Sequence, residues 1–250
     1  MNTKEKTKEV CTRIFNVKYV LGRFTLILSF CFFLTACSTM GVNETVRYEK
    51  DIVYCKNWLA GKPSPGIERN LKNKIELRYF YLGKLDVAIG WLEEALAIKD
   101  ESVLKDEGVI CNLAIVYTAT KKYDLATENY SKLLNTSYRQ EGLYGQGSIC
   151  LELKEYEKAL NYYNKGALEE SDFAPYGALS VCYEEIGDID SALKEQKKEL
   201  EHAKNCLPVQ ARLLRLKILA GEQIEKSYAQ LIKLNCSNPK HVYILYALST

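Results

Sequence analysis

Apolar and polar residues recur in the same order four times along the chain. The copies align on four alanines, spaced 38, 33 and 33 residues apart, which are Ala88, Ala126, Ala159 and Ala192. On either side of each alanine, apolar residues recur three or four positions apart, which is the spacing of one face of an α-helix. The pattern therefore predicts four helix pairs, with the alanine in the second helix of each pair.

Small residues mark the expected contact inside each pair. Ala114, Gly147 and Ser180 take the same position on the first helix, and their size lets two helices approach closely. Glu76 takes this position in the first copy, so we expect that unit to open differently. In the fourth copy, Gln196 makes the second helix locally polar. Four residues are predicted to begin the second helices and to fill the seam between units: Leu85, Tyr123, Tyr156 and Ile189.

The second and third copies agree most closely, as "YDLATENYSKLL" from Tyr123 and "YEKALNYYNKGA" from Tyr156 show. This pattern resembles the tetratricopeptide repeat, whose units of about 34 residues are helix-turn-helix pairs stacked into a superhelix. The resemblance implies an all-α fold, an α-solenoid of antiparallel helix pairs with about four to five repeats and capping helices.

The repeats and the segments around them suggest four regions. Residues 67–206 hold the four repeats, and residues 37–66 hold a helix that "GKPSPG" breaks. Residues 207–250 contain a degenerate fifth helix pair and then Asn238-Pro239, which is typical of a helix start and indicates a C-terminal capping helix. Residues 1–36 read as a lipoprotein signal peptide.

The evidence for that leader is the stretch "TLILSFCFFLTACST". Six basic residues against two acidic ones precede an apolar core that is too short for a typical membrane span. Leu34-Thr35-Ala36-Cys37 resembles a bacterial lipobox, which implies that Cys37 is lipidated and that the chain is cut before it. Ser38 follows, where an aspartate in the resembling families retains proteins in the inner membrane, so we expect the outer membrane. An uncleaved signal anchor over 24–42 is the alternative.

Composition narrows the function of the remaining chain. The 34 basic and 32 acidic residues fall to 28 and 30 once the leader is removed, which gives no electrostatic case for nucleic acid. No CxxC occurs and the chain has two histidines, so no metal site and no cofactor are expected. Six cysteines remain besides Cys37. We favour buried thiols on helices, and disulfides stay open in an oxidising compartment.

The first helices of the units are expected to line a concave face that binds protein partners. Helical spacing places ten residues there: Asn73, Leu77, Tyr81, Asn112, Ile115, Tyr144, Ser148, Glu152, Val181 and Glu184. This face is apolar at one end and acidic at the other, and Tyr81, Ile115 and Tyr144 are the expected anchors.

We interpret the chain as a lipid-anchored, periplasm-facing scaffold of the bacterial outer membrane, with no small-molecule substrate. It resembles pilotin-type lipoproteins of pilus or secretin assembly and adaptor lipoproteins that recruit peptidoglycan enzymes. The alternative is an envelope enzyme or enzyme subunit that uses acidic pairs such as Glu93-Glu94, Glu169-Glu170 and Glu184-Glu185. None of the common catalytic motifs accompanies these pairs.

Overall fold

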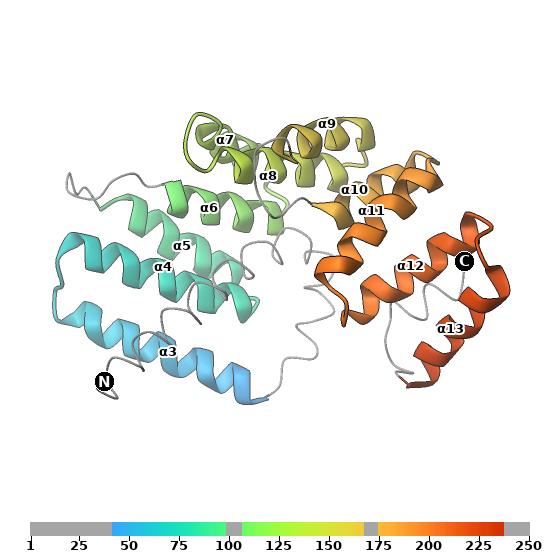
Figure 1. Cartoon of the computed structure of the whole chain (residues 1–250). Helices are drawn as coiled ribbons and strands as arrows, with labels where there is room; N and C mark the ends of the chain where they lie inside the picture. Colours follow the sequence, from blue (N-terminus) through green and yellow to red (C-terminus); the bar gives the residue numbers. More distant parts are fainter. Residues whose placement is uncertain (1–41, 99–106, 168–174, 238–250) are drawn as a thin grey trace, which may run out of the picture. The chain divides into compact units, whose positions relative to one another are not determined.

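The computed structural model describes residues 42–98, 107–167 and 175–237, and all regular structure in these ranges is α-helical (Figure 1). The helices are α3 (Val42–Ala60), α4 (Pro65–Tyr81), α5 (Leu85–Leu96), α6 (Glu107–Ala119), α7 (Tyr123–Leu133), α8 (Arg139–Glu152), α9 (Tyr156–Ala167), α10 (Tyr176–Glu185), α11 (Ile189–His202), α12 (Leu207–Leu219) and α13 (Ile224–Ser237). The predicted all-α solenoid is confirmed. The leader with Cys37 and the expected cap after Asn238 lie outside the described residues.

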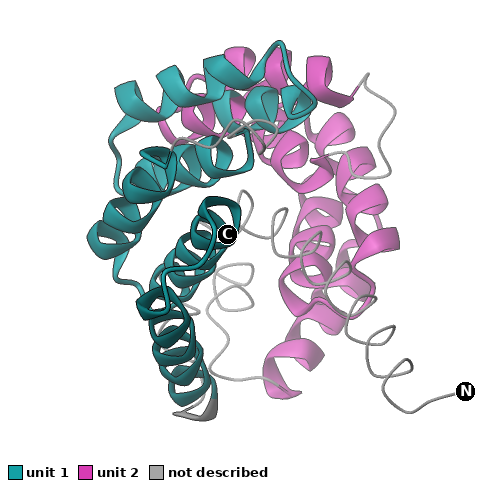
Figure 2. Ribbon diagram, turned by 90° about the vertical axis from the view of Figure 1, so that its left-hand side faces the viewer, with its two compact units in different colours: residues 1–146 teal, residues 147–250 magenta. Residues whose placement is uncertain are grey.

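The chain divides into two compact units, residues 1–146 and residues 147–250 (Figure 2). The division falls within α8. In the first unit, α3 packs on α4, α4 on α5, α5 on α6 and α6 on α7. In the second unit, α9 packs on α10, α10 on α11, α11 on α12 and α12 on α13. Each unit is thus built by the same rule, in which every helix packs against its neighbours along the chain.

The small residues of the repeat lie where the two helices of a pair touch. All four repeat alanines are fully buried, and Leu85, Tyr123, Tyr156 and Ile189 begin the second helices as predicted. In the fourth pair, the Ser180 hydroxyl donates a hydrogen bond of 2.9 Å to the Ala192 carbonyl oxygen. In the third, a Cβ atom on Gly147 would lie 2.8 Å from the Tyr163 ring. No larger side chain fits at such a contact without moving the partner helix.

The polar stretch expected in α11 is instead part of the interior. Gln196 is almost fully buried, and its Nε2 atom donates a hydrogen bond of 3.2 Å to the Val209 carbonyl oxygen of α12. A buried amide costs free energy unless it is paired, and the pairing here joins two successive repeats. The local sequence did not reveal this role because the acceptor belongs to the next pair.

The same turn joins the two helices of all five pairs. Its central residue has a positive φ, which is 70° at Gly83, 58° at Lys121, 61° at Lys154, 86° at Gly187 and 75° at Gly221. The following amide reaches back to a carbonyl five residues earlier, as in the 2.9 Å hydrogen bond from Asp188 N to Tyr183 O. This C-terminal cap, with a residue in the left-handed region and backbone hydrogen bonds across the turn, ends the first helix and directs the chain toward the second. Its presence at Gly221 shows that the fifth pair, α12 and α13, keeps the repeat geometry.

Four of the six remaining cysteines are buried, which fits their expected packing role. Cys55, Cys111, Cys150 and Cys182 lie in the interior, while Cys236 is exposed. Burial raises the pKa of the Cys182 thiol to about 12, so this thiol stays protonated and unreactive at neutral pH. Among the described residues, no helix combines the length and the apolar character needed to cross a bilayer.

Alanine substitutions at two glycines test whether the turn requires a positive φ. Neither has a neighbour within 4 Å of an added Cβ atom, but Gly187 has a positive φ and Gly90 lies inside α5. Gly187→Ala should lower the free energy of unfolding by about 1 kcal/mol because of backbone strain. Gly90→Ala should raise it by roughly 0.5 to 1 kcal/mol. Urea unfolding measures both, and effects of the same sign would contradict the assigned turn.

Candidate protein-binding surface

The first unit brings together two of the predicted binding residues from successive repeats. Asn73 lies on α4 and Asn112 on α6, and the Asn112 Nδ2 atom donates a hydrogen bond of 2.9 Å to Asn73 Oδ1. Both side chains are half-buried. An amide pair of this kind fixes the register between two first helices and leaves further donor and acceptor positions on each side chain.

Tyr81 lies at the end of α4, and its ring stacks on Tyr48 of α3 with the ring centroids 5.4 Å apart. The Phe80 ring meets it edge-on at 6.1 Å. Tyr81 and Leu77 are both half-buried. Burial raises the pKa of Tyr81, so its hydroxyl remains a neutral hydrogen-bonding group at any physiological pH. The two residues present a partly apolar surface beside the asparagine pair.

Ile115 and Tyr144 are buried rather than presented on a surface, with exposed fractions of 7% and 1%. The Tyr144 hydroxyl accepts a hydrogen bond of 3.1 Å from Gln140 Nε2 within α8. The expectation of surface exposure is therefore wrong for these two residues, and their role in binding stays a prediction. The sequence also indicated the burial of Ile115, since "VICNLAIVYTA" in α6 is mostly apolar and such a helix is largely buried.

In the second unit, the predicted residues differ in how far they reach the surface. Ser148 is buried, and its hydroxyl shares a hydrogen bond of 3.1 Å with the Tyr163 hydroxyl. Burial raises the pKa of Tyr163, so this contact joins two neutral hydroxyls between α8 and α9. Glu152 and Val181 are half-buried. Their binding role also stays a prediction, and Ser148 has a packing role already.

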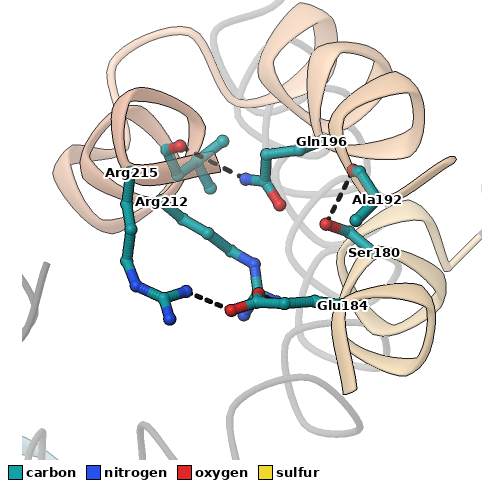
Figure 3. A network of polar contacts seen from close by, with 7 residues as sticks. Ser180, Glu184, Ala192, Gln196, Arg212 and Arg215 are labelled. Carbon is teal, nitrogen blue, oxygen red and sulfur yellow. Dashed lines mark hydrogen bonds and ion pairs between the residues drawn. The ribbon is translucent and has the colours of Figure 1, made fainter. Parts of the chain in front are cut away.

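Glu184 is held by two arginines from the next repeat (Figure 3). Its two carboxylate oxygens accept hydrogen bonds from Arg212 and Arg215 of α12, and its side chain is 11% exposed. The surface at this position is therefore not acidic, which corrects the sequence-based expectation. Arg212 and Arg215 lie three residues apart and so share one face of α12. Sequence reasoning missed them because they belong to the degenerate fifth pair.

Glu93 and Glu94, a second pair proposed for catalysis, also join helices. Glu93 accepts a hydrogen bond of 3.0 Å from the Tyr117 hydroxyl, and Glu94 accepts one of 2.8 Å from Lys72 Nζ. Burial and the bond to Glu93 raise the pKa of Tyr117 to about 12. The third pair, 169–170, lies outside the described residues. Within the described ranges, no group of three or more acidic, cysteine or histidine side chains is arranged to hold a metal ion.

Glu76 is the one repeat position with a buried acid in place of a small residue. Its side chain is nearly inaccessible, and its Oε2 atom has no hydrogen-bond partner. Burial raises the pKa of Glu76 to about 8, and Arg78 lowers it only partly. The carboxyl is therefore neutral at moderately acidic pH. Unlike Ala114 or Ser180, this residue makes the packing of the first repeat depend on proton concentration.

Residues 140–168, which cover most of α8 and all of α9, match the tetratricopeptide repeat family model. None of the curated proteins compared with the chain matches its sequence. Solved structures share the fold. A thermophilic TPR protein of Thermus thermophilus has a TM-score of 0.57 and 18% identity, covering 72% of this chain and 97% of its own.

Two further structures extend the likeness over more of the chain. BtubC from P. vanneervenii has a TM-score of 0.60 and 16% identity, covering 81% of this chain and 94% of its own. A tetratricopeptide repeat protein from Parabacteroides merdae has a TM-score of 0.56 and 14% identity, covering 88% and 91%. The repeat match and the shared fold together support a tetratricopeptide repeat protein.

The buried acid predicts a pH-dependent stability. Below the ordinary pKa of 4.5, Glu76 is protonated whether the chain is folded or unfolded. Between pH 4.5 and about 8, the unfolded chain loses this proton while the folded chain keeps it, so stability falls as pH rises, by at most about 1.4 kcal/mol per unit. Glu76→Gln should flatten this decline in melting temperature.

Glu157→Gln provides the matched control, because Glu157 is an exposed acid on α9. It should retain the wild-type pH profile. A Glu76→Gln profile that overlays the wild type between pH 5 and 8 would show that Glu76 is not a neutral buried acid in the folded protein.

Proposed function

We propose that this chain is a lipid-anchored tetratricopeptide repeat scaffold that binds protein partners on the periplasmic side of the bacterial outer membrane. Assembly of the cell envelope is the process that fits best, through a pilotin-like role with a pilus or secretin or through recruitment of peptidoglycan enzymes. Folds of this class generally serve as non-catalytic interaction scaffolds. No nucleic acid, small-molecule substrate or cofactor enters this proposal.

The scaffold part rests on how the polar side chains of both helices of a pair are used. Glu184 is neutralised by two arginines, Glu93 and Glu94 each bind a side chain of a neighbouring helix, and Asn73 is paired with Asn112. These contacts hold repeats in register and do not bring an acid and a base together around a substrate. A rigid face that is partly apolar, as at Leu77 and Tyr81, suits a peptide or protein surface.

The anchor part depends on the sequence around Cys37. The lipobox-like residues 34–37 follow a basic leader and a short apolar core, and α3 begins at Val42, only five residues after Cys37. A folded stack that starts this close to an acylated cysteine would be held at the membrane surface. A domain on a long linker would also be tethered, but it could move away from that surface.

Labelling with a radioactive fatty acid tests the anchor. In cells that produce the full-length chain, the wild type should take up label and Cys37→Ala should take up none, because the thiol is the only acceptor proposed. Cys31→Ala is the matched control, since Cys31 lies in the same apolar run but six residues before Cys37. This variant should be labelled as the wild type is.

Two results would overturn the anchor. Label that persists on Cys37→Ala would place the acyl group elsewhere. A full-length, uncleaved chain in both the wild type and Cys37→Ala would favour the signal anchor over residues 24–42 instead.

A further inference from the structure

Helix α3 has an apolar face that the described helices leave exposed. Its opposite side is packed, since Ile52 and Cys55 lie in a cluster with residues of α4. Four large side chains on the outer side are 42% to 61% exposed: Val46, Val53, Tyr54 and Trp58. Single exposed apolar residues are ordinary, but a set on one helix indicates a surface that binds something.

The charged residues on this face are all basic. At 100° per residue, the four apolar side chains lie within an arc of about 140°. Arg47 and Lys50 fall inside the same arc, and both are exposed. The nearest acids, Glu49 and Asp51, fall outside it, and the Asp51 carboxylate is bound at 3.1 Å by the Arg78 guanidinium. The outer face of α3 therefore combines apolar side chains with two cations and no carboxylate.

The aromatic residues on this face are of the kind that prefers the headgroup layer of a bilayer. Tyr54 and Trp58 are one helical turn apart, and their ring centroids lie 6.2 Å from each other. Tyrosine and tryptophan place an apolar ring among acyl chains and a polar tip in the headgroup region. Arginine and lysine beside them extend their charges to lipid phosphates. Aromatic rings flanked by cations therefore fit an anionic lipid surface.

The position of the face along the chain points to the same occupant. From Cys37 to Val42, a fully extended chain spans at most about 18 Å. Helix α3 has 19 residues and is therefore about 28 Å long. An acyl group on Cys37 would hold the start of this helix within reach of the lipid headgroups, and the helix is long enough to lie along them.

We propose that the outer face of α3, formed by Val46, Arg47, Lys50, Val53, Tyr54 and Trp58, lies on a bilayer that contains anionic lipid. It forms a second membrane contact beside the lipidated cysteine, and so rests on the anchor of the proposed function. The lipidated cysteine fixes only the start of the chain at the membrane, whereas an amphipathic, basic surface adds a contact that holds α3 along the bilayer.

Trp58 itself reports the contact. The chain has two tryptophans, so Trp91→Phe leaves Trp58 as the sole emitter. Residues 38–250 carrying an N-terminal histidine tag are bound to vesicles of phosphatidylcholine and phosphatidylglycerol that contain a nickel-chelating lipid. We expect Trp58 emission to shift to shorter wavelength and to be quenched by brominated acyl chains. Unchanged emission and no quenching would overturn the proposal.

The wild-type chain provides a second reading that does not depend on the Trp91 substitution. Its quenching by brominated lipid should be lost in Trp58→Phe, which retains Trp91. Without the nickel lipid, Val53→Ser with Tyr54→Ser should weaken vesicle partitioning about tenfold. Lys132→Glu, an exposed charge change on α7, should leave partitioning unchanged. Equal quenching in wild type and Trp58→Phe would count against the face.

Attachment through the histidine tag and the nickel-chelating lipid makes this test independent of the test of the Cys37 anchor. Because nickel-chelating lipid replaces the acyl groups, a negative result here leaves Cys37 lipidation standing, and a failure of fatty-acid labelling leaves this test valid. A concentration-dependent shift of Trp58 emission without vesicles, accompanied by dimers in sedimentation, would instead assign the face to a second copy of the chain and overturn the lipid contact.

Discussion

The close approach of two helices at a small residue is the contact on which the rest of this structure depends. Ala88, Ala126, Ala159 and Ala192 are all fully buried at this contact. Because the two helices of a pair lie this close, the chain needs a left-handed turn before the second helix of the pair. Larger residues such as Tyr130 and Tyr163 fill the space beside the contact. Only glycine fits at positions 145 and 147, because the Tyr130 and Tyr163 rings, respectively, occupy the space that a Cβ atom would need.

The paired polar groups between helices follow from the same constraint. Once helices are packed this closely, a carboxylate or amide on one of them is within reach of the next, and pairing removes the cost of burial. Glu184 with Arg212 and Arg215 shows this most clearly, and the Gln196 Nε2 atom is paired in the same way with the Val209 carbonyl oxygen. Such contacts give a rigid stack whose remaining surface is free to serve as a platform.

The sequence predicted the helices well because the repeat is local. The starts at Leu85, Tyr123, Tyr156 and Ile189 follow from spacing within about 34 residues. It predicted the surface less well. Ile115 and Tyr144 are buried because neighbouring helices cover both sides of their own, and Glu184 is neutralised by partners that lie 28 and 31 residues further on. The periodicity of a single repeat does not predict the contacts between side chains of different repeats.

We propose that the face of the first unit formed by its first helices, with Leu77 and Tyr81, binds a protein. A photoreactive phenylalanine derivative at Tyr81, in the full-length protein in living cells, tests it most directly, because a covalent adduct forms only with a molecule that touches this position. We expect adducts with another protein from Tyr81 and none from Glu157, an exposed position on α9. Adducts from Glu157 with none from Tyr81 would contradict it.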